Sequence, residues 1–106
     1  MLTINLDGKV INIMGINFKI LVINKLFDEN NKVLGFSDYA NSLIKLEDNQ
    51  DDQNKLQTLV HEITHIILWN TGYDDLNANE QLIVAFGNVL YQVLKDNDLI
   101  EIINHK

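Results

Sequence analysis

Short runs of apolar, β-prone residues, separated by turn signals, characterise the first half of the chain. Residues 3–13 contain Asp7-Gly8, a pair typical of two-residue type I′ turns, and therefore predict a first hairpin. Residues 18–23, Phe-Lys-Ile-Leu-Val-Ile, predict a third strand that is apolar enough to be largely buried. The start of the chain therefore predicts three strands within its first 23 residues.

A second hairpin is predicted after a polar connector. Residues 24–34 are mostly polar, and Leu26 and Phe27 are the side chains available to anchor this connector to the core. Residues 35–39 and 42–46 are β-prone and flank a short turn, as expected for two antiparallel strands. Together with the first three strands, they predict a small antiparallel sheet.

The second half of the chain changes to the 3.6-residue period of amphipathic helices. Residues 53–70 and 79–96 predict two helices joined by a loop. The acidic residues 47–53 offer an N-cap to the first helix, and Gly72 is suited to a left-handed cap at its end. Residues 99–104 fit either a short strand or a helical turn. The expected core-facing stripe of the second helix is Leu82, Phe86, Val89 and Val93.

Strands followed by helices predict an α+β fold, with a small antiparallel sheet packed on two main helices. The length of 106 residues predicts a single domain over residues 1–106, and without cysteine any metal must be bound by histidine and carboxylate side chains. We find no secretion signal and no apolar run of about 20 residues that would span a bilayer. A formal net charge of -7 disfavours binding to the negatively charged phosphates of nucleic acids. We therefore expect a cytoplasmic protein with neither a membrane nor a nucleic-acid partner.

The pentapeptide His61-Glu-Ile-Thr-His65 is the strongest functional signal in the chain. Residues four apart lie on one face of a helix, so His61 and His65 can bind one ion. Glu62 lies beside that ion and is the predicted general base. Apolar residues occur on both sides of this helix, including Leu68 and Trp69 on its polar side. We therefore expect the helix to be covered on both sides and the histidines to lie in an interior cleft.

A hydrolytic zinc site usually has three protein ligands and one open position. Glu80 is the preferred third ligand, because the preceding loop lets the second helix fold back against the first. Asp74 and Asp75 of that loop are the alternatives, and His105 is disfavoured because it is the penultimate residue. Gly87 shares a stripe with Glu80, and a close helix contact there would explain a glycine that costs about 1 kcal/mol relative to alanine.

Stabilisation of an oxyanion is a further requirement of zinc peptidases, and the chain contains no arginine to provide it. Three tyrosines are candidates. Tyr73 is more simply explained by packing on Trp69, and Tyr91 by packing within the second helix. Tyr39 ends a predicted strand that can border the cleft, so its role stays open.

Two motifs together resemble the ImmA/IrrE-like metallopeptidases of phages, mobile elements and their bacterial hosts. His61-Glu-Ile-Thr-His65 matches the His-Glu-x-x-His helix of that family. The segment from Glu80 to Gly87 is similar to its Glu-x-x-Ala-Asn-x-Phe-Ala helix at the first, seventh and eighth positions, but has Ile83-Val84 in place of Ala-Asn. The resemblance covers residues 35–95 and implies a glutamate third ligand and endopeptidase activity, often against a repressor or other regulator.

These observations predict a zinc-dependent endopeptidase that acts on a protein or peptide substrate. His61, His65 and Glu80 are expected to bind Zn²⁺, while Glu62 activates the attacking water as a general base. One alternative is a non-enzymatic phage or mobile-element protein, whose structural zinc site helps to bind a regulatory partner. Another is a metal-dependent hydrolase of a non-peptide substrate. Glu62 favours catalysis, because a structural zinc site has no need of a carboxylate between its histidines.

Overall fold

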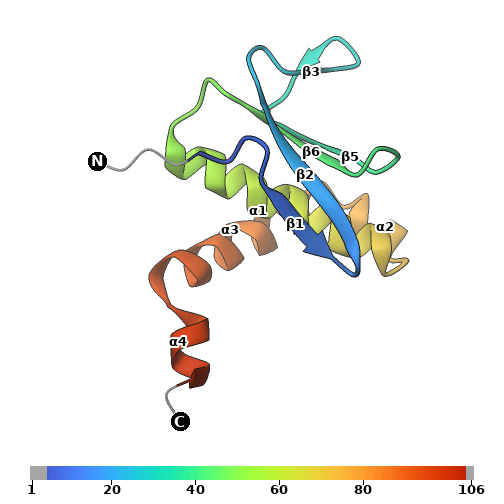
Figure 1. Cartoon of the computed structure of the whole chain (residues 1–106). Helices are drawn as coiled ribbons and strands as arrows, with labels where there is room; N and C mark the ends of the chain where they lie inside the picture. The colour runs from blue at the N-terminus through green and yellow to red at the C-terminus, as the bar shows by residue number, and fades with distance from the viewer. Residues whose placement is uncertain (1–4, 105–106) are drawn as a thin grey trace.

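The computed structural model describes residues 5–104, in which strands precede helices (Figure 1). A four-stranded sheet has the order β1-β2-β6-β5, formed by β1 (Val10–Ile13), β2 (Ile16–Ile23), β5 (Gly35–Asp38) and β6 (Leu43–Glu47). A separate two-stranded sheet pairs β3 (Phe27–Asp28) with β4 (Asn31–Lys32). The helices are α1 (Asp52–Asn70), α2 (Asp74–Asn77), α3 (Glu80–Asp96) and α4 (Leu99–Asn104). The predicted α+β class is confirmed, and residues 99–104 are helical.

The main sheet is mixed, whereas the sequence predicts an antiparallel one. The β1–β2 and β5–β6 pairs are antiparallel as expected, but β2 and β6 lie side by side and run parallel. Two parallel strands need a long connection, because the chain must return to the end of the sheet at which the first strand began. Residues 24–42, which include β3, β4 and β5, form that connection. The local pattern marks each strand but contains no information about which distant strands pair.

The turn of the first hairpin lies at Met14-Gly15. Asp7-Gly8 does form a turn, closed by a hydrogen bond of 3.1 Å from the backbone N–H of Lys9 to the carbonyl of Leu6, but among the described residues it does not join two strands, and Asp7 lacks the positive φ of a type I′ turn. Met14 and Gly15 have φ values of 51° and 83°, as both central residues of a type I′ turn require. The carboxylate of Asp7 also accepts a hydrogen bond of 2.8 Å from the backbone N–H of Val22, which holds the Asp7-Gly8 turn beside β2. Residues 3 and 4 of the predicted first strand lie outside the described residues.

The connector before β5 is anchored by one of its two predicted apolar side chains. Leu26 is buried, whereas Phe27 is 52% exposed. The carboxylate of Glu47 accepts hydrogen bonds from the backbone N–H groups of Asn49 (2.9 Å) and Leu26 (2.8 Å). These hydrogen bonds lower the pKa of Glu47 below its ordinary value and attach the connector to the end of β6.

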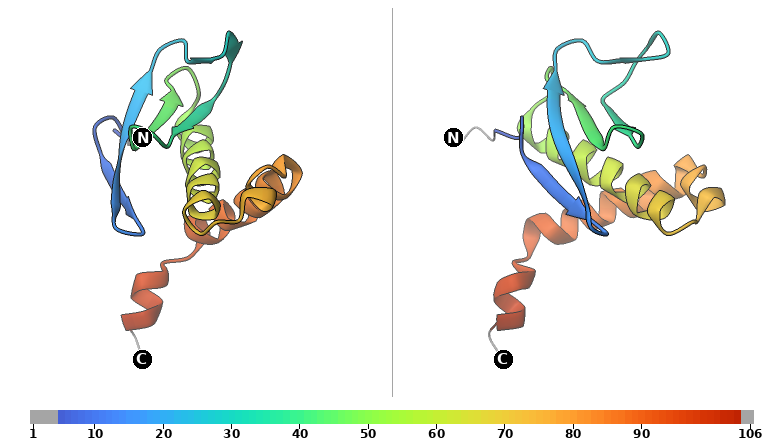
Figure 2. Two further views of the ribbon diagram at one scale, coloured as in Figure 1. Left: turned by 90° about the vertical axis from the view of Figure 1, so that its right-hand side faces the viewer. Right: turned by 45° about the vertical axis from the view of Figure 1, so that its right-hand side comes forward.

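The sheet, α1 and α3 form successive layers (Figure 2). One side of α1 packs on β5 and β6 and the other on α3, so the expectation that α1 is covered on both sides is confirmed. The third layer differs from the prediction, since α3 packs mainly on α1 and α2, not on the sheet. The core between the sheet and α1 consists of Ile13, Phe18, Ile20, Ile44, Leu46, Leu59 and Ile66.

Both ends of α1 are fixed by the predicted capping residues. The carboxylate of Asp51 accepts a hydrogen bond of 2.7 Å from the backbone N–H of Asn54 at the N-terminus. At the C-terminus, Gly72 has a φ of 82°, and the N–H of Tyr73 donates to the carbonyl of Leu68 at 2.9 Å. This cap stops α1 and turns the chain toward α2 and α3. Among the described residues, no helix combines the length and apolarity needed to cross a membrane.

The buried stripe of α3 is not the one that the sequence predicts. Ile83 and Gly87 are buried, whereas Leu82 and Phe86 are 39% and 56% exposed, and Val89 is also exposed. The helix has apolar residues on more than one face, so its periodicity does not single out the face that is covered. α3 turns the face of Ile83 and Gly87 toward α1, which leaves Leu82, Phe86 and Val89 of the predicted stripe exposed, while Val93 is half-buried.

Candidate metal centre

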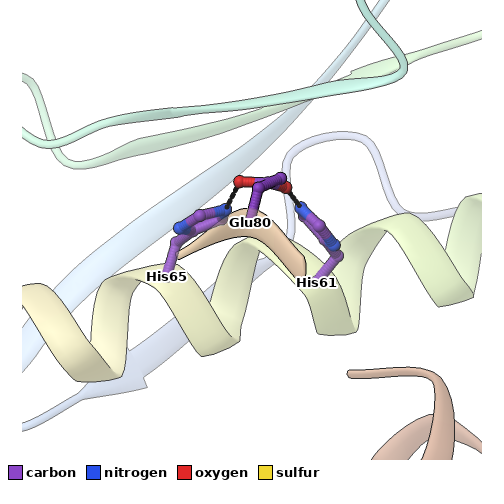
Figure 3. Close-up of side chains that lie close together, drawn as sticks. All are labelled: His61, His65 and Glu80. Atoms are coloured by element: carbon purple, nitrogen blue, oxygen red, sulfur yellow. Dashed lines mark ion pairs between the residues drawn. The ribbon is translucent and has the colours of Figure 1, made fainter. Parts of the chain in front are cut away.

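Side chains from α1 and α3 converge at one point (Figure 3). The Nε2 atom of His61 lies 2.7 Å from Oε1 of Glu80, and Nε2 of His65 lies 3.2 Å from Oε2 of the same carboxylate. One potential ligand atom from each residue lies within 4.8 Å of the others. The predicted juxtaposition of His61, His65 and Glu80 is therefore present, and the group can bind a metal ion.

The approach of α3 to α1 explains how Glu80 reaches the histidines. Asn79 caps α3 by accepting a hydrogen bond of 3.1 Å from the backbone N–H of Leu82, so Glu80 is the first residue of the helix. Two turns later, a Cβ at Gly87 would lie 3.7 Å from the Cα of His61. The two helices therefore touch at Gly87, where even a methyl group would make only an ordinary contact, and Glu80 lies two turns earlier beside both histidines.

The donor set fits a borderline divalent cation such as zinc, which prefers imidazole and carboxylate ligands. With metal–ligand bonds of about 2.0–2.1 Å, tetrahedral ligand atoms lie roughly 3.3 Å apart. The contact of 2.7 Å between His61 and Glu80 is a hydrogen-bond distance, so the carboxylate must move outward slightly to accept an ion. Its side chain is 61% exposed and has room for this movement.

The exposure of the three residues corrects the expectation of an interior cleft. The side chains of His61 and His65 are only 26% and 15% exposed, and they lie between α1 and its neighbours. Glu80 is 61% exposed because the N-terminus of α3 lies at the edge of the layers. The centre is therefore covered on the histidine side and open to solvent on the Glu80 side.

Glu62 is buried beside this centre and points toward β5. The hydroxyl of Ser37 donates a hydrogen bond of 2.7 Å to Oε1 of Glu62, whose residue is only 7% exposed. Burial raises the pKa of Glu62, and the negative charge of Glu80 adds to this effect. The Ser37 hydrogen bond and the neighbouring His61 and His65 act in the opposite direction. The carboxyl group therefore takes up a proton more readily than an exposed glutamate does.

Two polar residues at the centre carry no recognisable signal in the sequence. Ser37 is one, because a serine in a strand has no pattern that predicts contact with Glu62. Its side chain reaches Glu62 because it faces inward from β5. Asn77 of α2 is the other, since its Oδ1 lies 2.6 Å from Nδ1 of His65. A hydrogen bond from Nδ1 to this oxygen leaves Nε2 as the lone-pair nitrogen of His65. Asn77 thus orients the ring with Nε2 toward Glu80.

A cleft of about 300 Å³ adjoins the centre, and it is lined by Gly35, Ser37 and Tyr39 as well as by Glu62 and the three-residue group. We call it the metal-site cleft. The ring of Tyr39 stacks on Trp69 with centroids 4.5 Å apart, and its hydroxyl lies 3.5 Å from Nδ2 of Asn77. Burial raises the pKa of Tyr39, so its hydroxyl stays protonated as a donor at neutral pH.

The other predicted candidates lie elsewhere. Asp74, Asp75 and Tyr73 line a separate hollow at the end of α1, and Tyr73 is 57% exposed while Tyr39 occupies the stacking position on Trp69. Tyr91 lies on α3 and does not line the metal-site cleft. His105 lies outside the described residues. Of the three tyrosines, only Tyr39 borders the candidate metal centre.

Comparisons of the chain with protein-family models, with curated proteins and with solved structures find no match. The functional interpretation of the centre therefore depends on its residues and on their geometry.

Proposed function

We propose that the protein is a zinc-dependent endopeptidase of the ImmA/IrrE-like type that its two sequence motifs resemble. His61, His65 and Glu80 hold Zn²⁺ through two imidazole nitrogens and one carboxylate oxygen. When bound, zinc lowers the pKa of a coordinated water and polarises the substrate carbonyl. The observation that carries the proposal is the buried carboxylate of Glu62, which lines the same cleft as the three ligands.

Glu62 is the general base and then the general acid of the reaction. Its raised pKa suits a group that accepts a proton from water and returns it to the leaving amine. Ser37 holds Oε1 in place, which leaves Oε2 as the oxygen available for proton transfer. Tyr39 lines the metal-site cleft, and in this proposal its hydroxyl donates a hydrogen bond to the developing oxyanion.

The substrate in this proposal is an extended peptide segment. The strand β5 lies at the edge of the main sheet, and its residues Gly35, Phe36 and Ser37 line the metal-site cleft. The unpaired edge of a strand binds an extended peptide through backbone hydrogen bonds. A peptide added to β5 therefore passes across the cleft, which brings one of its carbonyl groups close to the metal centre.

The alternative is a structural zinc site in a protein that binds a regulator without cleaving it. Structural zinc sites are normally closed, with all four positions taken by protein ligands. Here the third ligand is 61% exposed, and a cleft opens beside the centre. These two features favour catalysis over a purely structural role.

The test combines metal analysis with a cleavage assay on a mixture of peptides. We expect Glu62→Gln to retain zinc and the fold but to lower the cleavage rate about 10²–10⁴-fold, because it removes the proton-transfer group. Glu29→Gln, on the exposed turn between β3 and β4, is the matched control and keeps full activity. Glu80→Ala lowers the zinc content. Equal cleavage by wild type and Glu62→Gln, or zinc binding without any cleavage, contradicts the proposal.

A further inference from the structure

A second hollow continues from the metal-site cleft along the groove between α1 and α3. It has a volume of about 480 Å³ and shares Gly35, His61 and Glu62 with the metal-site cleft. We call it the α1–α3 pocket. Because these three residues line both spaces, the pocket adjoins the place where a molecule at the metal centre would lie.

The walls of the α1–α3 pocket are apolar on one part and neutral polar on the other. Val33 and Leu34, from the segment before β5, and Val84, from α3, form the apolar part. The polar part consists of amide and hydroxyl side chains: Asn54, Gln57 and Thr58 of α1, and Asn88 of α3. Among the described residues that line the pocket, only His61 and Glu62 of the metal centre are ionisable.

The amide pair Gln57–Asn88 spans the groove between the helices. The Nε2 of Gln57 donates a hydrogen bond to the Oδ1 of Asn88. An amide side chain has two N–H donors and one carbonyl acceptor, so this bond leaves the carbonyl of Gln57 and the N–H groups of Asn88 for other partners. The part of the pocket away from the metal centre thus offers neutral donors and acceptors, and within the described chain no Lys or Arg lines the pocket.

This composition determines which side chains the pocket can accept. An acidic group that entered would lose hydration without gaining a cationic side chain of Lys or Arg to pair with, which is strongly unfavourable. An acidic group would in addition approach the carboxylate of Glu62. A bulky uncharged group gains about 25 cal/mol for each Å² of apolar surface that it buries against Val33, Leu34 and Val84. The volume is within the range of pockets that enclose small organic ligands, about 300–1,000 Å³.

We propose that the α1–α3 pocket binds the substrate side chain next to the cleaved bond and selects bulky uncharged residues over acidic ones. The selected class comprises leucine, methionine, phenylalanine and glutamine side chains. This inference rests on the proposed function, because the pocket acts on a substrate only when the adjoining centre holds a metal ion.

The test uses two small hydroxamates, which bind zinc directly and therefore do not require cleavage. One carries an isobutyl arm and the other a carboxyethyl arm of similar length, and their affinities for the zinc-loaded protein are measured by calorimetry. We expect the isobutyl compound to bind at least about tenfold tighter, which corresponds to roughly 1.4 kcal/mol. Val84→Lys places a positive charge in the pocket wall, and the preference should then reverse toward the carboxyethyl compound.

The matched control is Val89→Lys, on the same helix. Val89 is 62% exposed and does not line the pocket, so this variant should keep the wild-type preference. Three results would overturn the pocket assignment. They are an unchanged preference in Val84→Lys, equal affinities of the two hydroxamates for the wild type, and no binding of either hydroxamate. The preference and its reversal without any peptide cleavage support the pocket and overturn the peptidase proposal. Peptide cleavage that does not depend on the residues next to the cleaved bond supports the peptidase proposal and overturns the pocket assignment.

Discussion

Gly35→Ala and Gly87→Ala introduce the same methyl group at two contacts of α1, and we expect opposite effects on stability. A Cβ at Gly35 would lie 2.5 Å from Cγ2 of Thr58 and 3.2 Å from both Cγ and Oε2 of Glu62. Carbon atoms are in optimal contact at about 3.5–4.0 Å, so β5 and α1 must separate by roughly 1 Å at this point. Gly35 therefore allows the strand to lie directly against the helix that carries Glu62.

Thr58 cannot easily turn away from the added methyl group. Its hydroxyl donates to the carbonyl of Asn54 at 2.8 Å and lies 3.1 Å from Oε1 of Gln50, so rotation would break these contacts. A β-branched side chain in a helix also has few alternative rotamers. Overpacking of this kind costs about 1–3 kcal/mol, which is the expected loss of unfolding free energy in Gly35→Ala.

Gly87→Ala should stabilise the protein. The nearest atoms to a Cβ at Gly87 are the Cα of His61 at 3.7 Å and Oγ1 of Thr64 at 4.0 Å, which are ordinary contacts. Alanine in a helix interior is favoured over glycine by about 1 kcal/mol. The two variants should therefore differ by roughly 2–4 kcal/mol in unfolding free energy.

Urea unfolding of the metal-free proteins, followed by the fluorescence of Trp69, measures this difference. Metal-free protein is required because a bound ion would add its own binding energy to the folded state. An unchanged m-value with a lower midpoint for Gly35→Ala and a higher midpoint for Gly87→Ala is the expected result. A Gly35→Ala protein as stable as the wild type, or a Gly87→Ala protein destabilised by more than about 1 kcal/mol, refutes the reasoning.

Three further predictions follow from individual contacts. Asn77→Ala should weaken zinc binding about 10–100-fold in a chelator competition, because His65 loses its orienting partner, and unchanged affinity would contradict this role. Ile83→Ala should lower the unfolding free energy by about 2–5 kcal/mol, whereas Phe86→Ala at an exposed position should change it by about 0.5 kcal/mol or less; the reverse order would restore the predicted stripe. Glu47→Gln should destabilise the protein at neutral pH and lose this effect in acid. The carboxylate has a lowered pKa in the fold, so its contribution is present above the unfolded pKa of about 4.5 and disappears as the pH falls through the folded value; a constant difference from pH 3 to 7 would contradict it.

Local sequence was sufficient for α1 and for half of the centre, but not for α2, which lies in the predicted loop. Periodicity, Asp51 and Gly72 define α1 because a helix and its caps depend on residues a few positions apart. The spacing of His61 and His65 places both rings on one face for the same reason. Glu80 was predicted as the third ligand beside the two histidines. The prediction was possible because a short loop between two helices brings the start of the second helix back to the first.

Only the tertiary structure decided which distant segments meet. The parallel pairing of β2 with β6, the burial of Ile83 in place of Phe86, and the contacts of Ser37 and Asn77 all join residues that local periodicity does not relate. A residue pattern specifies that a face is apolar, but the partner that covers it is selected by packing of the whole chain. The helix that carries Glu62 is therefore predictable from the sequence, whereas the buried surroundings of its carboxylate come from a strand 25 residues away.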